Sequence, residues 1–128
     1  MRLSSDATWI PPLFPAAYPE VVGVTGVDAN RKVLPEACRG EQVDFAAQGS
    51  NVVVAAAGGG FGEIRGTSFA TPVVAGLLAR TLDVPDPAKS REALASLESG
   101  ALDLGKEGPD PTYGKGLVGA DLRAGRRE

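Results

Sequence analysis

The sequence contains no histidine, and its only cysteine is Cys38. Without histidine, the chain lacks the side chain that usually removes the proton from a catalytic serine. A lone cysteine cannot form an internal disulfide. Long hydrophobic runs are also missing, because proline and glycine interrupt each candidate, so no segment is predicted to span a membrane. The net charge of −3 gives no reason to expect binding to nucleic acid or to an anionic membrane.

The chain has the length and the apolar content of one globular domain. Its 128 residues are 43% hydrophobic, which is enough for a real core and argues against disorder of the whole chain. Residues 1–9 include no apolar core long enough for a signal peptide, so the sequence assigns no compartment. It shows no metal-ligand cluster and no phosphate loop, and no metal or cofactor is expected.

The stretch from Gly66 to Ala79 is the most informative part of the sequence. It carries no charged side chain, and apolar residues occupy every face of the helix that it predicts, which is typical of a buried helix. The stretch begins with Thr67 and Ser68. One interpretation is that either hydroxyl caps the helix. The other is chemical: a serine at a helix start lies near free N–H groups that can stabilise an oxyanion on a substrate carbonyl.

The order Gly-Thr-Ser-x-Ala-x-Pro-x-Val-Ala-Gly over residues 66–76 resembles the nucleophile motif of the subtilisin-like serine proteases. Val73 stands where that family usually has histidine, which we regard as a tolerated variation. The resemblance implies that Ser68 is the acylating nucleophile and that Thr67 lies beside the oxyanion site. It also implies a peptide or protein substrate.

Three further segments resemble the same family in the same order. Residues 18–28 are similar to its Tyr-Pro-x-Val strand segment, residues 43–49 to its Val-x-Ala-Pro-Gly turn, and residues 113–118 to its late Tyr-Gly-x-Gly signature. The resemblance implies an α/β fold: the C-terminal portion of a subtilisin-like three-layer fold, with a mostly parallel sheet and a central buried serine-bearing helix. Residues 1–128 would form a single partial catalytic domain, with an irregular start (1–10), a family-like region (11–122) and a charged tail (123–128).

Local patterns predict the elements around the serine helix. Residues 20–27 and 51–56 are predicted to be strands, and residues 57–65 a loop. Asp86 followed by Pro87 is a helix-start signal for an amphipathic helix over residues 88–97.

Residues 11–19 are too rich in proline for a helix or a central strand, which predicts an extended surface loop. In the subtilisin-like family, a segment of this kind helps to form the wall of the pocket for the substrate residue before the scissile bond. By that resemblance, Leu13, Phe14 and Ala16 are predicted to contact substrate.

The family's other catalytic groups are missing. Its chain order is Asp, His, Ser, and only the serine is present here. No lysine stands in a Ser-x-x-Lys spacing to Ser68, and residues 4–7 read Ser-Ser-Asp-Ala where the family's oxyanion asparagine is expected. We therefore predict that the chain alone is inactive. It is either the nucleophile-bearing piece of a serine endopeptidase, completed by the N-terminal part of a subtilase domain, or a non-catalytic remnant or binding module. Either way, missing strands should leave sheet edges and a helix face uncovered.

Overall fold

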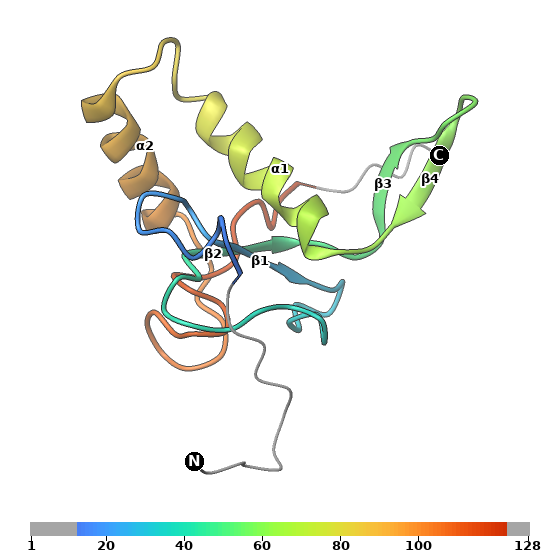
Figure 1. Ribbon diagram of the computed structural model, residues 1–128, viewed down its shortest axis with the longest axis horizontal. Helices are drawn as coiled ribbons and strands as arrows, with labels where there is room; N and C mark the ends of the chain where they lie inside the picture. The colour runs from blue at the N-terminus through green and yellow to red at the C-terminus, as the bar shows by residue number, and fades with distance from the viewer. Residues whose placement is uncertain (1–12, 123–128) are drawn as a thin grey trace.

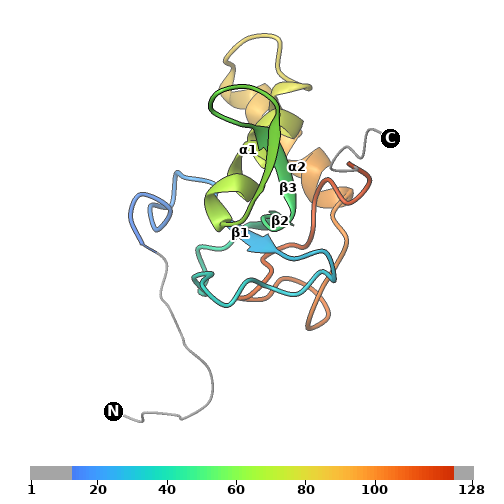
Figure 2. The same cartoon turned by 90° about the vertical axis from the view of Figure 1, so that its right-hand side faces the viewer.

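The computed structural model describes residues 13–122, which form four strands and two helices (Figure 1, Figure 2). In chain order these elements are β1 (Val24–Val27), β2 (Phe45–Gln48), β3 (Val52–Ala55), β4 (Phe61–Ile64), α1 (Thr67–Ala79) and α2 (Pro87–Ser99). Neither of the helices described combines the length and the apolar character needed to cross a membrane.

The strands β1 and β2 form a parallel pair at the centre of the molecule, with Val24 opposite Phe45. A later segment extends this sheet on the far side of β2. Ala46 donates its N–H to the carbonyl of Gly116 (2.9 Å) and accepts the N–H of Val118 (2.9 Å). β1 is shorter than the strand predicted over residues 20–27, because a turn joins the N–H of Val21 to the carbonyl of Tyr18.

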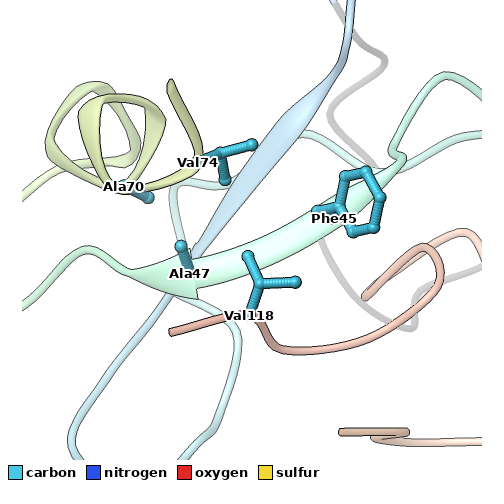
Figure 3. Close-up of a cluster of buried hydrophobic side chains, with 5 residues drawn as sticks. All are labelled: Phe45, Ala47, Ala70, Val74 and Val118. Atoms are coloured by element: carbon cyan, nitrogen blue, oxygen red, sulfur yellow. The ribbon is translucent and has the colours of Figure 1, made fainter. Parts of the chain in front are cut away.

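The main core lies between α1 and this sheet (Figure 3). Its buried side chains are Phe45, Ala47, Ala70, Val74 and Val118. Because Ala47 and Ala70 are small, the helix can lie close to β2. The opposite face of β2 buries a second cluster, made by Val27, Ala46 and Leu117. Full burial of each large apolar side chain stabilises the fold by about 1.5–3 kcal/mol.

The strands β3 and β4 form a separate antiparallel hairpin, with Ala55 opposite Phe61. The prediction of a strand over residues 51–56 is confirmed as β3, but the loop predicted over residues 57–65 is wrong because it contains β4. Three consecutive glycines, residues 58–60, reverse the chain with φ values of 87°, 102° and 77°. Such positive φ angles are easily adopted only by glycine, so the glycine run makes a tight turn between two strands.

The helix α2 confirms the helix predicted after Asp86 and extends it by a few residues. The Asp86 carboxylate caps the helix by accepting the N–H of Ala88 (2.8 Å), and Pro87 occupies the first turn. Ala93 is the buried residue of α2, and Leu94 and Leu97 pack against the main core.

The fold is a small α/β structure with parallel strands and two helices, and it differs from a complete three-layer fold in two respects. First, α1 is not buried all round: Ala70 and Val74 are buried, whereas Thr71, Pro72, Ala75 and Gly76 are exposed. Second, both helices lie over one face of the β1–β2 pair, and loops lie on its other face (Figure 1). The described residues therefore form no third, helical layer, and they cover only one side of α1.

Candidate active site

Ser68 is the second residue of α1 and is exposed to solvent, and Thr67 before it is half-buried. Neither hydroxyl caps the helix. The capping position is Gly66, with φ 149° and no side-chain cap hydrogen bond, so the capping interpretation of Thr67 and Ser68 is wrong. Phe69 donates its N–H to the Gly66 carbonyl (3.1 Å), but within residues 13–122 the N–H groups of Thr67 and Ser68 have no hydrogen-bond partner. The exposed hydroxyl therefore lies beside free N–H groups at the positive end of the helix dipole.

A close contact of three glycines fixes the start of α1 on the sheet. Gly66 donates its N–H to the carbonyl of Gly49 (2.7 Å), just after β2. A Cβ atom on Gly49 would lie 2.9 Å from the Gly66 oxygen and 3.2 Å from the Gly26 Cα atom in β1. A Cβ atom on Gly26 would lie 3.2 Å from the Thr67 Cα atom. Only glycine permits this approach, so the ends of β1 and β2 determine where Ser68 stands.

An ion pair holds the segment that enters α1. Arg65 binds Glu36 with two parallel contacts, Nε to Oε1 at 3.0 Å and Nη2 to Oε2 at 2.9 Å. The hydrogen bond from Arg65 is the main reason why the pKa of Glu36 falls to about 2, and the same bond raises the pKa of Arg65. Sequence reasoning missed this pair because its members come from two loops that are distant in the chain and carry no shared motif.

The residues predicted to contact substrate show no link to Ser68. Leu13 and Phe14 are exposed, and Ala16 is half-buried. The Phe14 ring contacts the Tyr18 ring, with centroids 4.7 Å apart. Among residues 13–122, no hydrogen bond joins this segment to the start of α1. Their role as a pocket wall therefore stays a prediction.

The described residues place no base beside the Ser68 hydroxyl. The Ser68 hydroxyl makes no hydrogen bond within residues 13–122, and Lys115 is paired with Glu98 (Nζ to Oε2, 3.1 Å). In the same residues, no three His, Cys, Asp or Glu side chains gather as a metal site. The arrangement can position a hydroxyl and stabilise negative charge beside it, but it offers nothing to accept the hydroxyl proton.

Comparison with known proteins gives one consistent family. The sequence profile of the Subtilase family (peptidase S8) matches residues 10–116. The chain is 32% identical over 111 residues to subtilisin E of Bacillus subtilis (strain 168), covering 87% of this chain and 28% of subtilisin E. It is 37% identical over 95 residues to halolysin of Haloferax mediterranei, covering 72% of this chain and 18% of halolysin.

The structural comparison agrees with the sequence comparison. A solved structure described as a lanthipeptide protease is similar with a TM-score of 0.68 and 26% identity, covering 82% of this chain and 42% of that one. The chain thus spans only 28% of the length of subtilisin E and less than half of the solved protease. Because the family profile matches most of the chain, this protein belongs to the Subtilase family of serine proteases and corresponds to a fraction of their catalytic domain.

Proposed function

We propose that this chain is the nucleophile-bearing C-terminal part of a subtilisin-like serine endopeptidase, in which Ser68 attacks the scissile carbonyl of a peptide or protein substrate. The observation that carries the proposal is the placement of an exposed Ser68 in the first turn of α1, beside N–H groups without a partner in the described chain. The similar solved structure is described as a lanthipeptide protease, which supports the same class of reaction.

The chemistry divides between this chain and groups that it does not contain. The Ser68 hydroxyl oxygen forms a bond to the substrate carbonyl carbon while a base accepts the hydroxyl proton. The carbonyl oxygen then carries negative charge, which the N–H of Ser68 and an oxyanion side chain stabilise. Here Thr67 lies beside the oxyanion site. The base, its orienting aspartate and the oxyanion asparagine would come from the N-terminal part of a subtilase domain.

The chain as given is therefore expected to show no peptidase turnover by itself. In subtilisin, loss of the serine or of the histidine lowers kcat by about 10⁶-fold, nearly as much as loss of the whole triad. A chain that has the serine but no base should show a loss of kcat of similar size. Peptide hydrolysis by the isolated chain at ordinary protease rates, abolished by Ser68→Ala, would contradict the proposal.

The test of completion is labelling by a fluorophosphonate, which reacts with activated serines. The full chain is incubated with and without a separately expressed subtilase segment that carries the family's Asp, His and Asn. We expect labelling only when the segment is present. Ser68→Ala should abolish it, whereas Ser96→Ala, at an exposed serine of α2, should leave it unchanged.

The alternative is that the chain is a non-catalytic remnant or binding module with the shape of a subtilase fragment. The absence of histidine favours it, because the sequence offers no imidazole to act as the base. Equal labelling with and without the segment, or no labelling despite a complex detected by size-exclusion chromatography, would discard completion and leave this alternative.

A further inference from the structure

The β3–β4 hairpin extends away from the rest of the molecule (Figure 1). It forms a sheet of its own, and within the described residues its strands pack substantially only against each other. Phe61 is 75% exposed and Val53 is 38% exposed. Within the described residues, these apolar side chains and both strand edges are therefore open to a partner. A two-stranded hairpin is only marginally stable in water when nothing packs against it.

The register shows which backbone groups of the hairpin point outward. Ala56 donates its N–H to the Gly60 carbonyl (3.1 Å), and hydrogen-bonded pairs alternate along an antiparallel ladder. Val54 and Gly62 therefore form the next hydrogen-bonded pair. It follows that Val53 and Ala55 direct their N–H and C=O groups away from β4. Neither residue bonds to another segment of the chain within residues 13–122.

Charge distinguishes the two edges of the hairpin. The β4 edge carries Glu63 and is followed by Arg65, and charged side chains of this kind keep natural sheet edges from pairing. The β3 edge has no such protection, because no residue from Gly49 to Gly62 is charged. A short, uncharged, β-branched strand without proline is the pattern that pairs with a copy of itself.

We propose that β3 is a self-association surface, which pairs antiparallel with β3 of a second copy of this chain about a two-fold axis at Val54. In this register, Val53 of each copy lies opposite Ala55 of the other, so the outward N–H and C=O groups exchange four hydrogen bonds. The two hairpins become one four-stranded sheet, as an isologous dimer requires. Directly opposed residues share a face, so Val53, Ala55 and Phe61 of both copies lie on one face of this sheet, with Glu63 of each copy beside Val53 at its outer side.

The test is the oligomeric state of the full chain by sedimentation equilibrium over a range of concentrations. We expect a monomer–dimer equilibrium for the natural sequence and at least about a tenfold higher dissociation constant for Val53→Lys, since lysine protects natural edge strands. Val84→Lys is the matched control: it adds the same charge at a valine that is 55% exposed in the α1–α2 loop, and it should not change the equilibrium.

A second variant covers the case in which the lysine disturbs folding. Val53→Pro removes an outward N–H, whereas the bonds between β3 and β4 do not use that group. It should also give a monomer. In the natural sequence, amide exchange at Val53 and Ala55 should slow as concentration rises, and exchange at Phe61 and Glu63 on the other edge should not.

Three results would overturn the proposal. The first is a natural chain that stays monomeric at the highest concentration. The second is a dimer that Val53→Lys and Val84→Lys affect equally. The third is protection of the β4 amides instead of the β3 amides. If the N-terminal subtilase segment dissociated the dimer, the segment and the second copy would compete for binding to this chain. The proposal that β3 is the self-association surface would then stand.

Discussion

At the scale of single residues, the position of Ser68 depends on glycines that have no chemical role of their own. Gly26, Gly49 and Gly66 come from β1, from the end of β2 and from the start of α1, and they meet with backbone against backbone. A methyl group on Gly49 would have to displace the Gly66 carbonyl or the β1 backbone. Neither can move freely, because both belong to hydrogen-bonded segments.

We therefore expect Gly49→Ala to lower the free energy of unfolding by about 1–3 kcal/mol, the usual cost of overpacking. The measurement is urea denaturation followed by circular dichroism. Gly62→Ala is the matched control, since a Cβ atom there meets nothing within 4 Å. Equal effects of the two substitutions would show that the glycine contact does not constrain α1.

The ion pair of Glu36 and Arg65 gives a pH dependence at the same scale. Because the folded pKa of Glu36 lies at about 2, below its ordinary value of 4.5, the pair stabilises the fold fully above pH 4.5. That contribution is lost as the pH falls from 4.5 towards 2. Both side chains are about half exposed, so solvent screens the pair and its contribution is the small one of a surface ion pair.

Glu36→Gln should accordingly lower the free energy of unfolding slightly at pH 7 and by less at pH 2, where the Glu36 carboxylate is about half protonated in the folded chain. Denaturant titrations at both pH values check the expectation. Glu41→Gln serves as control, because Glu41 forms no ion pair within the described residues. A loss that is the same at both pH values would mean that Glu36 acts through packing and not through its charge.

At the scale of elements, α2 is the helix whose start depends on one side chain. We expect Asp86→Ala to lower the free energy of unfolding by about 1 kcal/mol, as loss of an N-cap does, because the N–H of Ala88 loses its acceptor. Asp86→Asn should retain most of the stability, since an amide oxygen also accepts. Chemical denaturation of both variants measures the difference, and an alanine variant as stable as the asparagine variant would contradict the role of the cap.

The helix α2 and the β3–β4 hairpin show what local sequence can and cannot predict. The start of α2 follows from Asp86 and Pro87, since capping and a fixed φ act within one turn. The strand β4 could not be predicted, because its four residues include a glycine and a glutamate and it is defined by pairing with β3. Pairing partners and positive φ angles in the glycine turn are set by the whole hairpin, not by any one position in it.

At the scale of the whole molecule, the family-like region was predictable because its motifs are local and follow one another in the expected order. The exposure of one side of α1 was predicted from the missing strands and not from the composition of the helix. A helix that is apolar on every face predicts cover on every face, yet the described residues cover one side only. This difference agrees with a chain that spans less than half of the solved protease.

Some features of the candidate site could likewise be predicted from the sequence, and others could not. Ser68 and Thr67 were predicted from a contiguous motif, and the structure places both at the start of α1. The Arg65–Glu36 pair and the glycine contact were missed, because each depends on segments that only the fold brings together. The substrate-contacting role of Leu13, Phe14 and Ala16 was assigned by resemblance alone, and it stays a prediction.

The glycine contact also has a consequence for the order of folding. Its three members lie far apart in the chain, so the loops between them must close before the first turn of α1 reaches its final place. We expect this closure to follow the transition state, in which most of the apolar surface is already buried. Changes at Gly49 should thus have low φ-values and act mainly on the rate of unfolding. The lifetime of the native state, more than the rate of folding, would then depend on these three positions being glycine.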